Sequence, residues 1–294
     1  MKVSPFSTID LPYHHEASFS NALLGIDPYR KGEGGDPGVD ISQSTMKDML
    51  LRARDRYFRG FYQEGLTLYA QVLSHDEENQ NAWTDQVRIL VDVGRCEAAA
   101  YWSDVAARRL SQIPVLRNAK AFALAHGGLI KEAKEIINVP VGTAETPMIW
   151  LLRGEVFLRI RANPFQRLFA PYKGIGRMGA FFCFLRALNP VPRDPFINQR
   201  IGLAYLLAGD AGRASEHLRF SLNMVPDNPL TLYGLAQCYR ISHDREHAVA
   251  YVKRAIAGNP NLDCAIELLQ WLHKPRLSNI GELFLGISKK KRRR

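Results

Sequence analysis

The feature that most constrains this chain is a repeat with a period of 34 residues. Pro195–Asn228 and Pro229–Leu262 align at that shift, with small, aromatic and proline residues at corresponding positions. The recurring pairs are Gly202 and Ala236, Tyr205 and Tyr239, Ala214 and Ala248, Ser221 and Ala255, and Pro226 and Pro260. A fixed period of this length is typical of stacked units, each of which buries its hydrophobic face against its neighbours.

Each unit is predicted to form two amphipathic helices. Apolar residues such as Ile201 and Tyr205 recur at helical spacing, which places them on one face. Gly209 separates the two halves of the unit, and glycine supplies the backbone freedom that ends a helix. Pro226 and Pro229 mark the next boundary, because proline is poor inside a helix and favourable in its first turn.

Small residues stand where the two helices of a unit would meet. Gly202 on the first helix, with Ala214 and Ser221 on the second, lets the two backbones approach closely. This pattern resembles the tetratricopeptide repeat (TPR) family, whose unit is a 34-residue helix–turn–helix. The resemblance implies an all-α, right-handed superhelical solenoid of helical hairpins with a C-terminal capping helix. It also implies a non-enzymatic scaffold, adaptor or chaperone that binds a partner peptide in its concave groove.

The same register extends upstream, so we predict about six repeats over residues 46–262. Four less regular units precede the two regular ones: Met46–Asn79, Gln80–Ile113, Pro114–Thr146 and Pro147–Asp194. A capping helix is expected at about Asp263–Lys274, ended by Pro275. The expected organisation is a glycine-rich, flexible N-terminal segment 1–45, a solenoid 46–274 and a basic tail 275–294.

Two units depart from the period. The third is one residue short and carries Pro140 where a small helical residue is expected, so its second helix should end early. The fourth is 14 residues too long, and the added segment at about residues 162–175 is rich in aromatic, proline and basic residues. Because such insertions fall on one rim of a solenoid, this one is either a binding element or a loop packed over a neighbouring groove.

The net charge of +10 is concentrated in two places. Residues 150–200 carry nine basic and two acidic residues, and the chain ends in Lys289, Lys290, Lys291, Arg292, Arg293 and Arg294. A run of like charges stays solvated and attracts polyanions. The alternative function is therefore binding of nucleic acid or an anionic membrane through the basic belt 150–200 and the tail 289–294. A solubilising tail and a nuclear-import signal are further interpretations of the same run. Lys173 and Arg177, beside a predicted helix start, are additional anion-binding candidates.

The resemblance to the TPR family also implies that the first helix of each repeat lines the groove. In the C-terminal half the partner-binding candidates are largely apolar: Phe196, Gln199, Leu203, Leu206, Leu207, Leu230, Tyr233, Gln237, Arg240 and Ile241. They either pack against the second helices or expose an apolar face for a peptide. Upstream, Lys47, Arg54 and Arg88 would form a partial anion site. They do not complete the basic clamp with which some family members hold chaperone C-termini.

No pattern for catalysis, a cofactor or a metal emerges, so we predict that the protein is not an enzyme. The GxGxxG match at Gly174–Gly179 lacks the preceding strand and the acidic residue that dinucleotide binding requires, and a turn before a helix explains it better. In the HxxEH match that ends at His247, the register places His243 in a turn and Asp244 near a helix start, so the two imidazoles should not share a face for zinc. His14 and His15 are interpreted as ordinary polar sequence.

The cysteines and the apolar runs of the sequence also indicate the cellular compartment. The four cysteines form no close pair, which favours a reducing environment: Cys96, Cys183, Cys238 and Cys264. No uncharged apolar run reaches the roughly 18 residues that a bilayer requires, and the first ten residues lack the apolar stretch of a signal peptide. We predict a cytoplasmic protein, located at a membrane surface if the basic tail binds lipid.

Overall fold

A computed structural model describes residues 43–110, 113–141, 145–160 and 175–274. Those residues form thirteen helices and no strand: α1 (Gln43–Phe58), α2 (Tyr62–His75), α3 (Gln80–Asp92), α4 (Cys96–Arg109), α5 (Pro114–His126), α6 (Ile130–Asn138), α7 (Pro147–Ile160), α9 (Ile175–Leu188), α10 (Pro195–Leu207), α11 (Ala211–Met224), α12 (Pro229–Ile241), α13 (Arg245–Gly258) and α14 (Asp263–His273). The chain is an all-α solenoid, as the sequence predicts.

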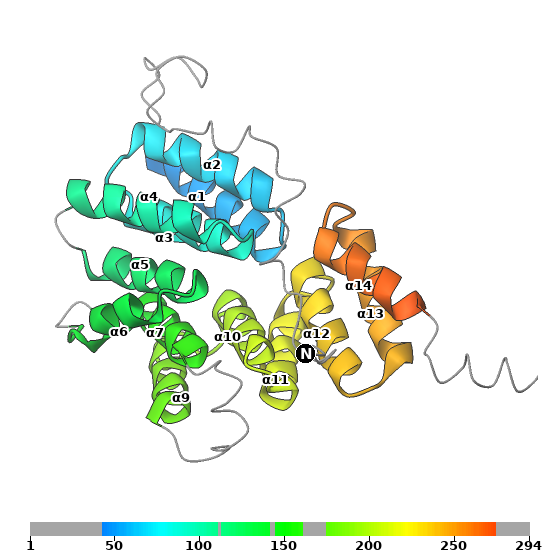
Figure 1. The fold of residues 1–294 in the computed structure, drawn as a ribbon. Coiled ribbons are helices and arrows are strands. Elements are labelled where there is room, and N and C mark those ends of the chain that lie inside the picture. Colours follow the sequence, from blue (N-terminus) through cyan, green and yellow to red (C-terminus); the bar gives the residue numbers. More distant parts are fainter. Residues whose placement is uncertain (1–42, 111–112, 142–144, 161–174, 275–294) are drawn as a thin grey trace, which may run out of the picture.

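The helices pair into hairpins that stack in chain order: α1–α2, α3–α4, α5–α6, α7–α9, α10–α11 and α12–α13. The second helix of most hairpins also packs against the first helix of the next, and α14 covers the last one (Figure 1). This is a TPR-like architecture. The capping helix ends one residue earlier than predicted, at His273, and α1 begins inside the segment expected to be flexible. Except for Ile175, which begins α9, the predicted insertion 162–175 lies outside the described residues.

One backbone feature recurs with the sequence period. Gly60, Gly94 and Gly128 end the first helices α1, α3 and α5, and all three have φ between 81° and 88°. Gly209 (φ 78°) and His243 (φ 62°), again 34 residues apart, hold the same place after α10 and α12. Left-handed backbone favours glycine, so the predicted turn chemistry is present after α1, α3, α5 and α10, and histidine replaces glycine after α12; the turn between α7 and α9 lies outside the described residues.

Small residues set the spacing of the helices, as the repeat pattern predicts. A Cβ atom built on Gly202 would lie 2.7 Å from the Leu218 side chain, and one on Gly234 would lie 2.9 Å from it. Helix starts are fixed by side-chain caps, because Asp194 and Asn228 each accept a hydrogen bond from a backbone N–H in the first turn. The predicted early end of the third repeat is also confirmed, since α6 has nine residues and ends before Pro140.

The first and second helices of the hairpins differ in burial. Every residue of α10 from Phe196 to Leu206 is buried, and the same holds for α3 from Ala82 to Asp92. The second helix α11 buries only a stripe: Ala214, Leu218 and Ser221. The first helices α3 and α10 therefore contact protein on all sides along these stretches, whereas the second helix α11 keeps a broad outer surface.

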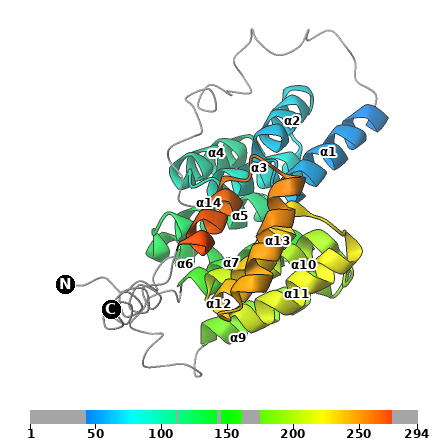
Figure 2. The ribbon, with the colours of Figure 1, turned by 90° about the vertical axis from the view of Figure 1, so that its right-hand side faces the viewer.

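The solenoid bends back on itself. In two perpendicular views the turn after α1 lies beside the last described helices, α12, α13 and α14 (Figures 1 and 2). Asn259, at the end of α13, donates its amide hydrogen to the carbonyl oxygen of Gly60 at 3.2 Å. The first hairpin thus contacts the last repeats, and the first helices enclose an interior.

Candidate functional site

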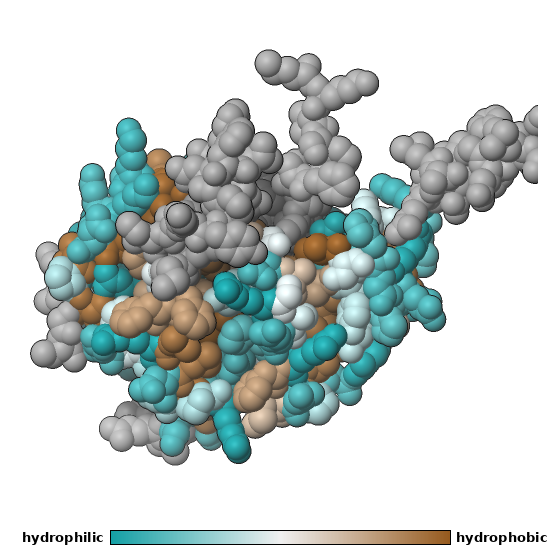
Figure 3. Space-filling view, turned by 90° about the horizontal axis from the view of Figure 1, so that it is seen from below, coloured by the Kyte–Doolittle hydropathy of each residue, from teal (hydrophilic) through white to brown (hydrophobic). Residues whose placement is uncertain are grey.

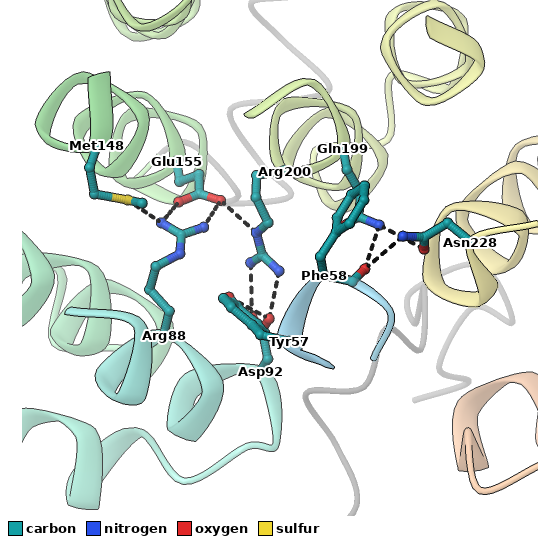
Figure 4. Close-up of polar contacts among 9 residues, drawn as sticks. All are labelled: Tyr57, Phe58, Arg88, Asp92, Met148, Glu155, Gln199, Arg200 and Asn228. Carbon is teal, nitrogen blue, oxygen red and sulfur yellow. Dashed lines mark hydrogen bonds and ion pairs between the residues drawn. The ribbon is translucent and has the colours of Figure 1, made fainter. Parts of the chain in front are cut away.

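The interior holds a buried network of charged groups, drawn in Figure 4. Arg88 on α3 donates two hydrogen bonds to the Glu155 carboxylate on α7, at 2.9 and 3.0 Å. Arg200 on α10 contacts both oxygens of Asp92 at 2.5 and 2.9 Å, and its Nε lies 3.6 Å from Glu155. The Tyr57 hydroxyl donates to Asp92 at 3.0 Å, and burial raises the pKa of this phenol. The formal charges of the two arginines and two carboxylates cancel, so the network ties four hairpins together without net charge.

A row of side-chain amides holds the turn after α1. Gln199 on α10 and Asn228 at the start of α12 donate to the carbonyl oxygen of Phe58, at 2.9 and 3.1 Å. Asn259 bonds Gly60 in the same manner. Figure 4 shows the Gln199 and Asn228 amides converging on Phe58. Such contacts satisfy backbone acceptors that burial would otherwise leave without a donor.

Aromatic packing supports the same closure. The Phe196 ring lies edge-on to Tyr57 at 5.5 Å and to Phe58 at 6.1 Å. The Arg54 guanidinium also lies over the Phe196 ring, 4.7 Å from its centre. The predicted groove is therefore filled at Phe196 by the end of the first helix.

This closure corrects the expected exposure of the groove candidates. Seven of the ten are buried: Phe196, Gln199, Leu203, Leu206, Leu230, Tyr233 and Gln237. The other three are partly buried: Leu207, Arg240 and Ile241. The physical reason is that the superhelix closes tightly enough for first helices to pack on one another across its axis. The seven buried residues belong to the interior of the described chain.

The expected partial anion site is corrected in the same way. Arg88 is fully buried and paired with Glu155, whereas Lys47 is exposed and Arg54 is partly exposed. The basic belt also loses members, since Arg153 and Arg200 are buried. A count of charges along the sequence does not distinguish a solvated arginine from one committed to the interior.

One part of the inner side stays open, as a cavity of about 320 Å³ at the starts of the first helices. Its walls come from α1, α3, α5, α7, α10 and the loops before them: Arg54, Gln80, Asn81, Ile113, Pro114, Val115, Thr146, Pro147, Met148, Ile149, Val191, Asp194 and Ile197. We call it the mouth cavity. Arg54 lies 3.8 Å from Asp194 across it, so its cation is partly neutralised. The mouth cavity can accept a side chain with an apolar body.

Exposed large apolar side chains gather on two second helices instead. Ten large hydrophobic side chains are exposed in the described residues, and five of them lie on α9 and α11: Phe181 (45%), Phe182 (53%), Leu185 (51%), Phe220 (38%) and Met224 (49%). We call these five residues the α9–α11 face. In Figure 3, which views the molecule from below, brown side chains gather on the left, where α9 lies, and again toward the centre.

The two helices of this face are neighbours through Tyr205 of α10. The Tyr205 ring lies edge-on to Phe184 of α9 at 5.3 Å and stacks on His217 of α11 at 5.9 Å. His217 shares one side of α11 with Phe220 and Met224, because residues three, four and seven apart lie together on a helix. That side of α11 therefore lies toward Tyr205, whose ring also packs against Phe184 of α9.

A hollow of about 510 Å³ adjoins the α9 part of the face. It lies between the segment after α6 and the α7–α9 hairpin, with Pro140, Trp150, Phe157 and Phe182 among its walls. Arg186 lies over the Trp150 and Phe182 rings, at 4.8 and 5.1 Å, and forms two hydrogen bonds with Glu145. Aromatic walls beside an exposed apolar helix are typical of protein-binding surfaces.

The remaining predicted site residues have these positions. Arg177 lies in α9, but its side chain is not described, and Lys173 and the tail Lys289–Arg294 lie outside the described residues. Gly176 and Gly179 lie within α9, so these two glycines of the GxGxxG match belong to a helix and not to the turn we expected before it, and Gly174 lies outside the described residues. His243 occupies the turn and Asp244 caps α13, as predicted.

In the described part of the chain, no cluster of three or more His, Cys, Asp or Glu residues is arranged to hold a metal ion. Among the helices described, none combines the length and the apolar character needed to cross a membrane.

Comparison with known proteins gives a likeness of fold. No protein-family model matches the chain, and no curated protein is similar to it in sequence. Among solved structures, YrrB is described as a TPR protein with an unusual peptide-binding site. It is 17% identical to this chain, the match covers 68% of this chain and 96% of YrrB, and the TM-score is 0.39. TTC0263, a thermophilic TPR protein of Thermus thermophilus, is 17% identical, with 76% and 97% covered and a TM-score of 0.41. Cut9–Hcn1 of the APC/C is 16% identical, with 78% and 43% covered and a TM-score of 0.45.

Proposed function

We propose that the protein is a non-enzymatic scaffold that binds a partner protein through the α9–α11 face. One observation carries this proposal: half of the large hydrophobic side chains exposed in the described residues lie on these two helices. Exposed apolar patches of this kind usually mark binding surfaces, because leaving them in water is unfavourable. The inner groove is the weaker candidate, since most of its predicted binding residues are buried in the chain itself.

The face suggests the chemistry of the partner. Helix α9 carries Arg177 and Arg186 and no acidic residue, with Arg186 bonded to Glu145 before α7, and α11 carries two arginines against one glutamate. A partner segment with apolar side chains flanked by acidic ones would match this surface. Apolar burial would supply most of the affinity, at about 25 cal/mol per Å² before the entropic costs of association. The complementary charges would mainly raise the association rate.

Two earlier hypotheses stay as predictions. A peptide bound on the concave side would now have to enter the mouth cavity, where Val115 and Met148 are partly exposed. Binding of nucleic acid or an anionic membrane would use the basic belt 150–200 and the tail 289–294, and the tail lies outside the described residues.

The test begins with cross-linking mass spectrometry on native cells, which identifies the partner. The purified partner is then titrated against the double variant Phe182→Glu/Leu185→Glu. We expect the dissociation constant to rise about 100-fold, since each buried apolar side chain contributes about 1.5 kcal/mol or more. Both positions are exposed, so circular dichroism should show unchanged helicity.

Two control variants complete the design. Leu129→Glu places one such charge at an exposed leucine outside the face and should leave affinity unchanged. Val115→Glu/Met148→Glu blocks the mouth cavity. If the cavity variant loses binding while Phe182→Glu/Leu185→Glu retains it, the partner enters the concave side and the proposal is wrong.

A further inference from the structure

The α9–α11 face is left uncovered by the described chain. Helix α9 uses one stripe to pack on α7, formed by Ala180, Cys183, Phe184 and Ala187, and all four are buried. The adjoining stripe with Phe181 and Leu185 is about half exposed. Two apolar stripes on neighbouring helices form a surface on which an amphipathic helix can lay its apolar side.

A segment of this chain has the complementary sequence. Residues 1–42 carry six acidic and three basic residues, a net charge opposite in sign to that of α9 and α11. Within them, Phe19, Leu23 and Ile26 are spaced four and three apart, the spacing of one helical face. Glu16 and Asp27 flank these residues, and no basic residue lies between them. The segment thus combines apolar residues at helical spacing with negative charge.

Covalent connection favours binding within the same molecule. Residues 27–42 join this segment to α1, and 16 residues can span up to about 55 Å when extended. That is roughly three times the ~17 Å radius of gyration of a compact chain of about 230 residues. If a connection of this length lets the segment reach the face, the effective concentration is near the millimolar range, so even a weak contact would be populated.

We propose that residues 16–27 bind the α9–α11 face in cis, with Phe19, Leu23 and Ile26 against its apolar stripes. Their competition with a partner protein rests on the function proposed above. The segment would shield the apolar surface until a partner of higher affinity displaces it. This assigns a role to the apolar and acidic residues that precede the first helix.

The test uses the full chain with the photo-cross-linking residue p-benzoylphenylalanine in place of Phe19. After irradiation, tryptic mapping should find intramolecular cross-links on residues 178–186 of α9 or 220–240, which begins in α11. The matched control carries the same residue in place of Phe6, outside the proposed segment. We expect at least about fivefold more cross-linking to the face from position 19 than from position 6.

Two further variants test the two sides of the contact. Phe181→Glu/Leu185→Glu in the same chain should reduce the cross-links from position 19 to the level of the Phe6 control, and so should Leu23→Asp. Leu129→Glu should leave them unchanged. Cross-links to any other element, or no cross-links above the control, would overturn the proposal. Cross-links between two molecules would identify the face as a contact between copies of this chain and would equally overturn it.

Failure of this inference can be separated from failure of the proposed function. The full-chain variant Phe19→Asp/Leu23→Asp should bind the identified partner about tenfold more tightly, because the competing segment is weakened. If position 19 shows no contact but Phe182→Glu/Leu185→Glu still loses the partner, only the cis contact is refuted. If position 19 cross-links to the face but the partner binds elsewhere, only the proposed function is refuted.

Discussion

The inner wall of the solenoid and its α9–α11 face show opposite relations between sequence and exposure. Both are rich in large apolar residues. On α10, Phe196, Leu203 and Leu206 are buried, whereas on α9 Phe181 and Leu185 are about half exposed. An apolar residue on the concave side of a repeat protein therefore marks a groove only if the superhelix stays open. Here it closes, so the concave side behaves as a core.

Closure also changes how the molecule holds together. In an open repeat array each unit contacts only its neighbours, and stability is approximately a sum of local contributions. Here Asp92 of the second hairpin pairs with Arg200 of the fifth, and Asn259 bonds Gly60 near the other end of the chain. We expect the two ends to unfold together. The predictions below test this contrast, from the largest effect to the smallest.

The largest expected effect comes from Asp92→Ala. The substitution leaves the buried Arg200 guanidinium and the Tyr57 hydroxyl without this carboxylate, so the free energy of unfolding should fall by about 3–5 kcal/mol. The measurement is urea denaturation followed by circular dichroism. Glu145→Ala, which breaks the half-exposed pair with Arg186, should cost less than about 1 kcal/mol. If Asp92→Ala and Glu145→Ala lowered the free energy of unfolding by the same small amount, the Asp92 pair would be exposed to water and the interior would not be closed.

The next effect concerns the amide row. Asn259→Ala removes the donor to the Gly60 carbonyl and should cost about 1–3 kcal/mol, because that acceptor is left buried. The decisive measurement is amide hydrogen exchange at the turn between α1 and α2. Exchange there should accelerate, although this turn lies about 200 positions from Asn259 in the sequence. Asn223→Ala, at an exposed position of α11, is the matched control. Acceleration confined to α13 and α14 would contradict closure.

A pH effect should follow from His126, whose ring packs on Phe122 at 4.5 Å. Burial lowers the pKa of this imidazole well below 6.5, and Arg159, Arg200 and Arg88 lower it further. Below pH 6.5 the unfolded chain therefore binds a proton that the folded chain does not. Stability should fall with decreasing pH by up to about 1.4 kcal/mol per unit from this group.

The check compares urea denaturation at pH 7.5 and 5.5 for the natural chain and for His126→Gln. The variant should show a smaller loss between the two pH values. His247→Gln, at an exposed histidine beside Asp244, serves as the control and should not remove the dependence attributed to His126. An unchanged dependence in His126→Gln would show that other groups cause it.

The smallest expected effect is stabilising. His243 holds the left-handed position that glycine holds after α1, α3, α5 and α10. His243→Gly should raise the free energy of unfolding by about 0.5–1 kcal/mol, because glycine adopts this conformation without steric cost. Thermal denaturation would measure it. His247→Gly, inside α13, should instead destabilise by about 1 kcal/mol.

The sequence predicts the local architecture because the signals for it are local. The period, the left-handed turn at Gly209, the close helix contact at Gly202 and the early end of α6 before Pro140 all follow from neighbouring residues. The resemblance to the TPR family then orders the hairpins into a solenoid. These elements agree with the structure.

Closure was not predictable in the same way, because it depends on small tilts between hairpins that accumulate along the chain. No local residue pattern predicts the total curvature that these tilts produce. One signal was present: Arg88, Glu155 and Arg200 interrupt helices that are otherwise largely apolar, and charges in such positions need partners in the interior. Which partners they take depends on the arrangement of α3, α7 and α10 in the folded chain.

The most direct test of closure is a double-mutant cycle between Asp92 and Arg200, which are 108 positions apart in sequence. Free energies of unfolding are measured for the natural chain, Asp92→Ala, Arg200→Ala and the double variant. A closed solenoid predicts a coupling energy of about 2–3 kcal/mol, since residues in direct contact deviate strongly from additivity. Effects that add to within about 0.5 kcal/mol would show that the second and fifth hairpins do not meet, and would contradict the account.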